Sequence, residues 1–414
     1  MAHVLDTLRE RGFIAQITDE EALRKRLDEG PLTFYVGIDP TAGSLHAGHL
    51  VPLYAMAHLA AAGHEAIALV GGGTARIGDP SGKTQMRKML SLEQIEANVA
   101  SITGQIEAFL SVRDTRARMV NNADWLAGLN YIEFLRDIGR HFSVNRMLSF
   151  ETYKMRLETG LSFIEFNYQL LQSYDFLELH RTYGCELQIG GDDQWGNIVA
   201  GADLIRRVTG GESFGLTSPL VTRADGKKMG KTEKGALFLD PQLITPYEFY
   251  QYWRNVPDRD VEKFLLLYTF LPIEECRELG SFEGQEINRA KERLAWEITT
   301  IVHGEAEADS ARQAARAAFG AGAAAAGEGD RSGIPAVELP ASQLEGGIGV
   351  LDLFASTELC ASKGEARRLV EQGGARVNDR KVEGIDAIID SSWVEEGELL
   401  LRAGKKRYFR VVVT

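Results

Sequence analysis

The chain has 414 residues, 44% of them hydrophobic and 25% charged, and a formal net charge of −13. This length predicts two or three domains with a full core. The three cysteines are far apart and no apolar run reaches membrane-spanning length, which argues against a disulfide framework, a zinc site and a membrane protein. With no secretion signal before the first helical stretch, we expect a cytoplasmic protein.

Strands and helices alternate along the first half of the chain. Helices are expected over 5–29, 46–62 and 92–110, and strands over 32–36, 66–70, 118–120 and 186–191. This alternation predicts right-handed βαβ units and a parallel sheet. Ligands bind beyond the carboxyl ends of such strands. Because Tyr35, the glycines 71–73 and the glycines 190–191 fall at expected strand ends, we expect the site there.

The second half is predicted to be helical and then to end in a small separate module. An Ala- and Gly-rich run after residue 319 indicates a linker. A helix capped by Ser362 and a strand over 375–378 are expected beyond it. The predicted organisation is a Rossmann-like α/β domain over 1–225, a mobile loop and connection over 226–245, a helical domain over 246–319, a linker over 320–345 and a small α+β domain over 346–414.

Two histidines open the helix that is expected near residue 46. With Ser44 as the N-cap, His46 and His49 lie on one face of the first turn. Free N–H groups and the helix dipole favour anions there, so the imidazoles could donate hydrogen bonds to a polyphosphate. Gly48 between them leaves room for a flat base. The alternatives are two surface histidines or a zinc pair, and zinc would need ligands that no other His or Cys cluster supplies.

A basic loop, Gly226–Thr232, is the second half of this pattern. Lysines are compact charges that suit phosphoryl oxygens, and Lys228 and Lys231 are three residues apart. A lysine-rich loop by itself is usually solvated surface. Paired with the histidine motif, it indicates a protein that handles a nucleoside triphosphate.

The segment Gly78-Asp79-Pro80-Ser81-Gly82-Lys83 does not have the spacing of a Walker loop. Asp79 could hold an ammonium group, and Lys83 and Arg87 could lie over phosphates. The alternative is an ordinary Asp-Pro-Ser-Gly turn, which the segment alone favours.

A polar stripe, Tyr168, Gln172 and Asp175, has the spacing of one helix face. If the stripe is buried, its polar groups need partners, and a substrate with an amine and a hydroxyl would satisfy them. A solvent-facing stripe is the equal alternative. Further on, the glycines of Gly190–Asn197 would let a ligand approach the backbone, and Asp193 could accept from ribose hydroxyls.

Together these motifs resemble those of a known family. The segments His46-Ala-Gly-His49 and Lys228-Met-Gly-Lys-Thr232 resemble the two signature motifs of class I aminoacyl-tRNA synthetases. The other motifs are similar to those of bacterial-type tyrosyl-tRNA synthetases over nearly the whole chain. They are Tyr35-x-Gly-x-Asp39-Pro-Thr, Gly-Asp79-Pro-Ser-Gly-Lys83, Tyr168/Gln172/Asp175 and Gly-Gly191-Asp-Asp193-Gln194-Trp-Gly-Asn197.

The resemblance implies tyrosine activation with ATP and Mg²⁺, followed by transfer to the 3′-terminal ribose of tRNA(Tyr). It implies a homodimer, no resident metal and no tightly bound cofactor. Tyr35 and Asp175 would bind the phenolic hydroxyl, and Asp79, Tyr168 and Gln172 the ammonium, with Asn122 nearby. His46 and His49 would act on the ATP phosphates. The adenylate would contact Asp39, Gly48, Gly191, Asp193 and Gln194, and the pyrophosphate would contact Lys83, Arg87, Lys228, Lys231 and Thr232.

Two departures from the family pattern stand out. Gly230 occupies a position where the class usually has serine, and both Gly230 and Thr232 look like variation known in this family. Asp192 stands where serine is common, directly beside Asp193. Because a second carboxylate near phosphates would weaken anion binding, we expect Asp192 to point away.

The C-terminal module is balanced in charge, with 11 Lys and Arg and 11 Asp and Glu over 346–414, so residues 1–345 carry the whole −13. Its basic clusters predict binding to a phosphate backbone, and the segment resembles a small RNA-binding module of a ribosomal protein and of pseudouridine synthases. A solvated basic helix is the alternative. The predicted RNA-binding residues are Lys363, Arg367, Arg368, Arg376, Lys405, Lys406 and Arg407. The resemblance also implies that the helical domain over 246–319 binds the anticodon stem of the tRNA.

Two other functions stay open at this point. A tryptophanyl-type synthetase shares the fold, but Tyr35 and Asp175 match a phenol better than an indole. An inactive RNA-binding paralogue would keep the fold, but no signature histidine or loop lysine is missing.

Overall fold

The computed structural model describes residues 3–81, 89–224, 226, 229–232, 235–319, 334–357, 359–404 and 407–414. The chain forms two compact units. The first combines Met1–Ile244 with Trp253–Val302, and the second combines Thr245–Tyr252 with His303–Thr414. The helical segment that we expected over 246–319 therefore contributes to both units.

A six-stranded sheet forms the centre of the first unit, in the order β1-β6-β5-β2-β3-β4. Strands β2 to β6 pair in parallel, and β1 pairs antiparallel with β6 at the edge. The predicted α/β fold with a parallel sheet is confirmed. The strands are β1 (Gln16–Ile17), β2 (Thr33–Ile38), β3 (Glu65–Val70), β4 (Ala117–Asn121), β5 (Cys185–Gly191) and β6 (Phe214–Ser218).

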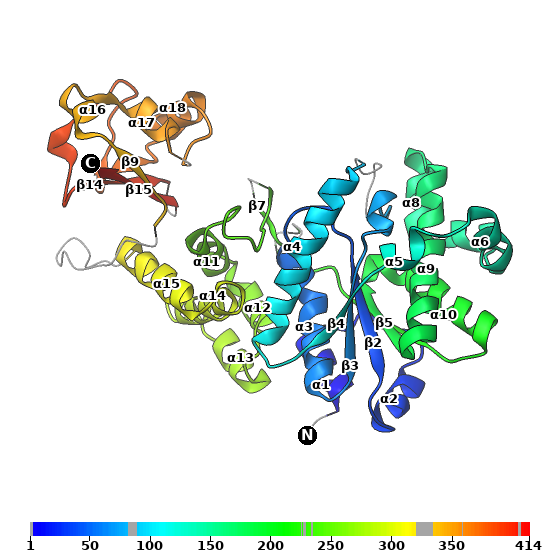
Figure 1. The fold of residues 1–414 in the computed structure, drawn as a ribbon. Helices are drawn as coiled ribbons and strands as arrows, with labels where there is room; N and C mark the ends of the chain where they lie inside the picture. The colour runs from blue at the N-terminus through cyan, green and yellow to red at the C-terminus, as the bar shows by residue number, and fades with distance from the viewer. Residues whose placement is uncertain are drawn as a thin grey trace. The chain divides into compact units, whose positions relative to one another are not determined.

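The strand order reverses between β2 and β5, which is where such sheets leave a crevice for ligands. From β2 the chain proceeds outward to β3 and β4, and then it returns to add β5 and β6 on the other side. The long helices α3 (Ala47–Ala61) and α4 (Leu92–Ser111) cover one face of the sheet. The helices α9 (Phe163–Tyr183) and α10 (Trp195–Thr209) lie on the other face (Figure 1).

One sequence expectation about the sheet was wrong, and two strands were missed. Strand β2 continues to Ile38, so Tyr35 lies in the middle of the strand and not at its end. The sequence analysis also missed β1 and β6. Strand β1 has only two residues, and β6 is buried at every position, so neither shows the alternation of a half-buried strand.

The start of α3 also differs from the expectation. The N-cap is His46, not Ser44, and the first helical residue is Ala47. The reason lies in tertiary contacts, because backbone hydrogen bonds with residues 237 and 239 hold Leu45 to Ala47 in an extended ladder. The helix begins only where this ladder ends.

The first unit contains further elements outside the six-stranded sheet. The N-terminal helices are α1 (Val4–Arg11) and α2 (Glu20–Asp28), the latter capped by Asp19. A hairpin, β7 (Lys231–Thr232) and β8 (Gly235–Ala236), follows the sheet. The other helices are α5 (Ala123–Leu126), α6 (Tyr131–Asp137), α7 (Val144–Ser149), α8 (Glu151–Thr159), α12 (Val261–Tyr268), α13 (Ile273–Gly280) and α14 (Ile287–His303).

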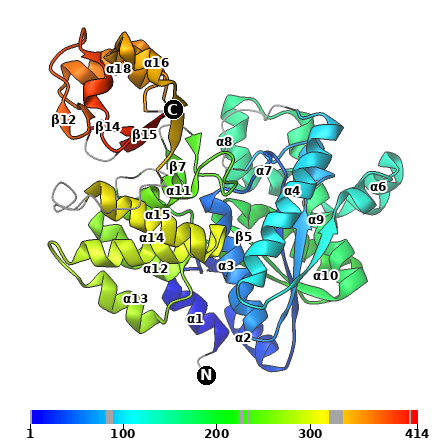
Figure 2. The ribbon, with the colours of Figure 1, turned by 60° about the vertical axis from the view of Figure 1, so that its left-hand side comes forward.

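The second unit contains a five-stranded sheet, in the order β12-β11-β14-β15-β9. The helices α16 (Ala341–Glu345), α17 (Val350–Ala355) and α18 (Lys363–Glu371) lie on one face of it (Figures 1 and 2). Helix α18 is capped by Ser362 as expected. The other elements are α11 (Pro246–Arg254), at the boundary with the first unit, α15 (Glu305–Phe319), β9 (Ala336–Leu339), β10 (Ile348–Gly349), β11 (Ala375–Val377), β12 (Arg380–Lys381), β13 (Ile388–Ile389), β14 (Glu398–Ala403) and β15 (Arg407–Val413).

The linker was predicted over 320–345, and this range extends too far at its C-terminal end. Strand β9 pairs in parallel with β15, and α16 follows it, so residues 336–345 belong to the folded module. Three of the four β9 residues are exposed, so the strand is defined by its pairing with β15 and not by burial of its side chains. None of the helices in the described ranges has the length and apolar character needed to cross a membrane.

Candidate active site

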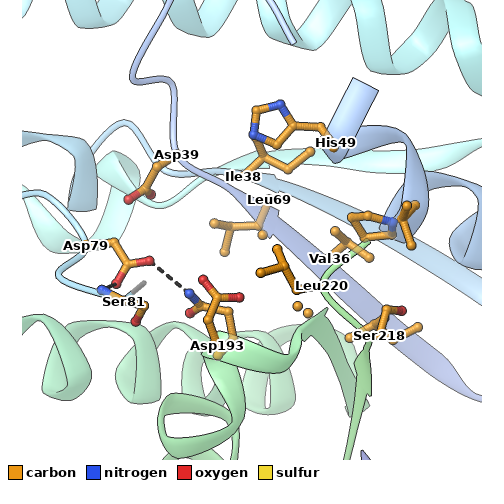
Figure 3. A pocket seen from close by; sticks show the side chains of 18 of the residues that line it. Val36, Ile38, Asp39, His49, Leu69, Asp79, Ser81, Asp193, Ser218 and Leu220 are labelled. Atoms are coloured by element: carbon orange, nitrogen blue, oxygen red, sulfur yellow. Dashed lines mark hydrogen bonds between the residues drawn. The ribbon is translucent and has the colours of Figure 1, made fainter. Parts of the chain in front are cut away.

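A cavity of about 420 Å³ opens at the switch point of the large sheet. It lies beyond the carboxyl ends of β2 and β5 and beside the first turn of α3. Figure 3 shows Asp39, His49, Asp79 and Asp193 arranged around one space. The cavity wall contains most of the predicted substrate residues, namely Tyr35, Asp39, His46, Gly48, His49, Asp79, Tyr168, Gln172, Asp175, Gly191, Asp193 and Gln194.

The other predicted residues are placed differently. Asn122 is 0% exposed and lies behind the wall, where it contacts Asp175. Lys231 and Thr232 form β7, and their backbone alone is described. Lys83, Arg87, Lys228, Lys405 and Lys406 fall outside the described residues.

The two histidines cap the helix that they open. Gly48 N donates to His46 Nδ1, and His46 N donates to His49 Nδ1, each over 3.1 Å. The rings stack, with centroids 3.8 Å apart. An imidazole whose Nδ1 accepts a hydrogen bond carries its proton on Nε2. These two hydrogen bonds therefore place the proton of each imidazole on Nε2.

Gly48 is required by this cap. A Cβ atom at Gly48 would lie 3.0 Å from His46 Cε1 and 3.1 Å from Nδ1, closer than most side-chain contacts. The histidine cap is therefore a structural reason for glycine at position 48. It is separate from the earlier argument that a glycine there leaves room for the base of a nucleotide.

One end of the cavity is polar but enclosed. Asp175 is 2% exposed, and its two oxygens accept from Asn122 Nδ2 over 2.9 Å and from Trp125 Nε1 over 2.7 Å. Burial raises the pKa of Asp175 to about 8, although these two hydrogen bonds oppose the shift. The hydroxyl of Tyr35 is buried nearby, has no hydrogen-bond partner among the described residues, and has its pKa raised by burial and by the Asp175 charge. The polar stripe of α9 therefore faces inward, and the solvent-facing alternative is wrong for Tyr168 and Asp175.

A second carboxylate, Asp39, follows β2. Its Oδ1 accepts from Thr74 Oγ1 over 2.7 Å, and its Oδ2 accepts from the Tyr168 hydroxyl over 2.8 Å. Burial raises the pKa of Tyr168 and the Asp39 charge raises it further, so the phenol remains a hydrogen-bond donor.

Asp79 forms the ordinary turn that its segment suggested, and it also lines the cavity. In the turn, its Oδ1 accepts from Ser81 N over 2.8 Å. Its Oδ2 accepts from Gln194 Nε2 over 2.8 Å, the dashed contact in Figure 3. Asn197 joins Gln194 to Gln172 through bonds of 3.0 and 2.9 Å.

Asp192 points away from the cavity, as expected. Its Oδ1 accepts from Gln16 Nε2 over 2.7 Å and from Thr217 Oγ1 over 3.0 Å. The adjacent Asp193 lines the cavity.

Sequence reasoning missed several polar residues at this site. Thr74 donates a hydrogen bond to Asp39, and Trp125 donates one to Asp175. Gln188 and Ser218 line the cavity. Trp125 and Thr74 each carried a weak signal, because one follows β4 within four residues and the other directly follows three glycines. Gln188 and Ser218 lie within strands, where no sequence pattern separates cavity residues from core.

Those predicted RNA-binding residues that the structure describes are spread over α18 and the sheet. Arg367 and Arg368 are exposed on α18. Lys363 pairs with Asp352, and Arg407 donates to Leu359 O over 3.0 Å. Arg376 donates to Asp379 O over 2.8 Å.

Comparison with known families divides the chain into two matched parts. Residues 27–320 match the family described as tRNA synthetases class I (W and Y). The chain belongs to this family of class I tRNA synthetases. Residues 328–411 of the synthetase match the Tyrosine--tRNA ligase SYY-like C-terminal domain, and the resemblance drawn from the motifs is confirmed.

The synthetase is also similar to curated relatives over its whole length. It is 59% identical to the tyrosine--tRNA ligase of Treponema denticola, over 100% of both chains. It is 54% identical to that of Acetivibrio thermocellus, over 99% of both. A crystal structure of a C-terminally truncated mitochondrial tyrosyl-tRNA synthetase from Aspergillus nidulans has a TM-score of 0.69 and 31% identity. That match covers 77% of the synthetase and 95% of the fungal chain.

Proposed function

We propose that this synthetase activates tyrosine with ATP, releases pyrophosphate, and transfers the tyrosyl group to the 3′-terminal ribose of tRNA(Tyr). The observation that carries the proposal is the enclosed polar end of the cavity. A phenolic hydroxyl there can donate to Asp175 and pair with the Tyr35 hydroxyl, which has no other partner in the described chain. An indole N–H could donate to Asp175 but would offer no oxygen to Tyr35, which favours tyrosine over tryptophan.

The remaining groups are proposed to bind the rest of the substrates. Asp79, Tyr168 and Gln172 hold the ammonium of tyrosine, with Asn122 supporting the phenol end. Asp39, Gly48, Gly191, Asp193 and Gln194 contact the adenylate and its ribose.

Activation needs no covalent enzyme intermediate. The tyrosine carboxylate attacks the α-phosphorus of ATP, and the bond to the pyrophosphate oxygen breaks. The Nε2–H groups of His46 and His49 stabilise the negative charge that develops on the phosphate oxygens. We propose that Lys83, Arg87, Lys228, Lys231 and Thr232 hold the leaving pyrophosphate.

Magnesium enters as part of the ATP substrate and neutralises phosphate charge. Among the described residues, no group of three or more His, Cys, Asp or Glu side chains could hold a metal ion by itself. This is compatible with an ion that arrives on the nucleotide.

The C-terminal module is proposed to bind the tRNA backbone through Lys363, Arg367, Arg368, Arg376, Lys405, Lys406 and Arg407. Residues 246–319 are proposed to meet the anticodon stem. Because charged tRNA is consumed in translation, we propose a cytoplasmic location.

We also propose a homodimer. Large apolar side chains are exposed on neighbouring elements of the first unit, among them Ile132 at 72% and Phe163 at 71%. Exposed apolar groups of this kind mark protein interfaces. A monomer in sedimentation equilibrium at micromolar concentration would contradict the proposal.

The function is tested by amino-acid-dependent exchange of pyrophosphate into ATP, without tRNA, using tyrosine, tryptophan and phenylalanine in parallel. Exchange with tyrosine alone is expected. Exchange with tryptophan would indicate a tryptophanyl-type synthetase. No exchange with any of the three amino acids would favour an inactive RNA-binding paralogue.

A Tyr35→Phe variant is expected to bind tyrosine about two- to tenfold more weakly, because one hydrogen bond to the phenol is lost. Isothermal titration with tyrosine measures this change. The substrate-free variant should unfold at an equal or higher urea concentration, because the deleted hydroxyl has no partner to lose. Tyr153→Phe, at a buried tyrosine outside the cavity wall, is the control, and unchanged tyrosine affinity in Tyr35→Phe would contradict the assignment.

A His49→Ala variant is expected to form tyrosyl adenylate about a hundredfold more slowly, because a donor to the transition-state phosphate is removed. Its tyrosine affinity should remain nearly intact. Stopped-flow measurement of adenylate formation separates the two effects. Because His49 Nδ1 also caps α3, urea unfolding is measured alongside, and equal losses of binding and rate would argue against a transition-state role.

A further inference from the structure

A chain of buried hydrogen bonds runs from Asp175 to Asp39. Asn122 Nδ2 donates to Asp175 Oδ2 and to Thr74 Oγ1, each over 2.9 Å. Thr74 Oγ1 lies 2.7 Å from Asp39 Oδ1. Asn122 is 0% exposed and Thr74 is 2% exposed. Bulk water therefore does not reach these groups to replace a bond that is lost.

The direction of each bond follows from the groups involved. An ionised carboxylate only accepts, so Thr74 donates its single proton to Asp39 and accepts from Asn122. Asn122 Oδ1 accepts from Gly73 N over 2.7 Å, which fixes the orientation of the amide. Both amide donors are then committed, one to Asp175 and one to Thr74. Neither Thr74 nor Asn122 can turn without breaking a bond at each of its sides.

The end of β3 is shaped to hold this arrangement. A Cβ atom at Gly71 would overlap both Asp39 Oδ1 and Thr74 Oγ1. A Cβ atom at Gly73 would lie 3.1 Å from Asn122 Oδ1. The glycines therefore let the hydroxyl, the amide and the carboxylate sit directly against the backbone.

The two ends of this hydrogen-bond chain, Asp175 and Asp39, face different parts of the substrate in the proposed function. Asp175 is at the phenol end of the cavity, and Asp39, with Tyr168, is at the end where the adenylate forms. We infer that Thr74 is a positioning residue for tyrosine selectivity. Its hydroxyl makes the position of Asp39 depend on the position of Asp175. Recognition of the phenolic hydroxyl at Asp175 is thereby coupled to alignment of the substrate at Asp39, where the adenylate forms. This inference rests on the proposed function.

A purely structural role for Thr74 predicts a different result. Loss of packing would lower the fraction of active enzyme, and it would lower the rates for all amino acids by the same factor. Loss of positioning would lower the rate for tyrosine more than the rate for phenylalanine, which has no hydroxyl to be read. The ratio of kcat/KM for tyrosine to kcat/KM for phenylalanine separates the two, because it does not depend on the active fraction.

The test is pyrophosphate exchange by the full-length protein with each amino acid. Thr74→Val keeps the shape of the side chain and removes the hydroxyl, and it is expected to lower the tyrosine-to-phenylalanine ratio by about tenfold or more. Thr74→Ser keeps the hydroxyl and should restore the ratio to within about threefold of wild type. Thr299→Val is the matched control, because Thr299 is equally buried in the same unit and its hydroxyl has no partner in the described residues.

Each outcome bears on the inference. A lower ratio in Thr74→Val, with Thr74→Ser and Thr299→Val near wild type, supports it. An unchanged ratio in Thr74→Val, whatever its rates, overturns it, and so does an equal fall in Thr299→Val. If Thr74→Val does not fold, the tyrosine-to-phenylalanine ratio of kcat/KM is measured for Thr74→Ala, which also lacks the hydroxyl and has a smaller side chain. Absence of tyrosine-dependent exchange in the wild type would instead refute the proposed function.

Discussion

An Asp175→Asn variant is expected to lose tyrosine activation by about ten- to a hundredfold in kcat/KM, because an amide cannot make all the hydrogen bonds that Asp175 makes at this end of the cavity. The carboxylate accepts from Asn122, from Trp125 and, as we propose, from the phenol. An amide offers one acceptor oxygen and directs an NH₂ group at another donor. Pyrophosphate exchange at varied tyrosine concentration measures the loss. That tyrosyl-tRNA synthetases discriminate strongly against phenylalanine is already established, and the prediction concerns only the residue responsible.

The same substitution should change how stability depends on pH. Burial raises the pKa of Asp175 in the folded protein from 3.8 to about 8. Between these values the folded protein holds a proton that the unfolded chain has released, so stability falls as pH rises. The stability of the wild type relative to Asp175→Asn should therefore decline by up to about 1.4 kcal/mol per pH unit from pH 4 to 8.

Urea unfolding of both proteins at several pH values tests this slope. Asp28→Asn is the control, because Asp28 is exposed in the same unit, with 69% of its side chain accessible. Parallel pH profiles for the wild type and Asp175→Asn would contradict the raised pKa. Undiminished tyrosine activation would remove Asp175 from recognition of the phenol.

A chain that ends at residue 319 is expected to form tyrosyl adenylate at a rate close to that of the full chain. Its charging of tRNA should be at least about tenfold slower, because the predicted phosphate contacts are lost. The cavity is made entirely from residues 35–236 of the first unit, so activation should survive. The cut precedes β9, because a cut at 345 would leave one strand of the C-terminal sheet behind.

A point-mutation test of the same idea leaves the module intact. The double variant Arg367→Ala/Arg368→Ala removes two exposed charges of α18 and should reduce the salt dependence of tRNA binding by roughly one unit of slope per lost contact. Arg380→Ala is the control, since Arg380 is already paired with Glu395 at 3.3 Å and is outside the predicted set. Undiminished charging by the truncated chain would remove the module from tRNA recognition.

The sequence by itself determined the fold class and most of the cavity residues. Alternation of apolar strands and helices predicted the parallel sheet, and the spacing of His46 and His49 predicted a shared helix turn. These features are local, because period, capping residues and glycine positions are set by the backbone over a few residues. The roles of the individual side chains remain proposals.

The tertiary structure alone decided which groups meet. Thr74 follows β3, whereas Asn122 and Trp125 lie together after β4. Only the packing of β2, β3, β4 and α9 brings them to Asp39 and Asp175. No local pattern marks a threonine or a tryptophan as the partner of a distant carboxylate.

The start of α3, the central position of Tyr35 and the extent of the C-terminal sheet were also decided by tertiary contacts. Backbone pairing with residues 237 and 239 delays the helix to Ala47. Pairing with β15 makes a strand of the exposed residues 336–339. In both cases the deciding hydrogen bonds join segments far apart in the chain, and the sequence of one segment does not reveal its distant partner.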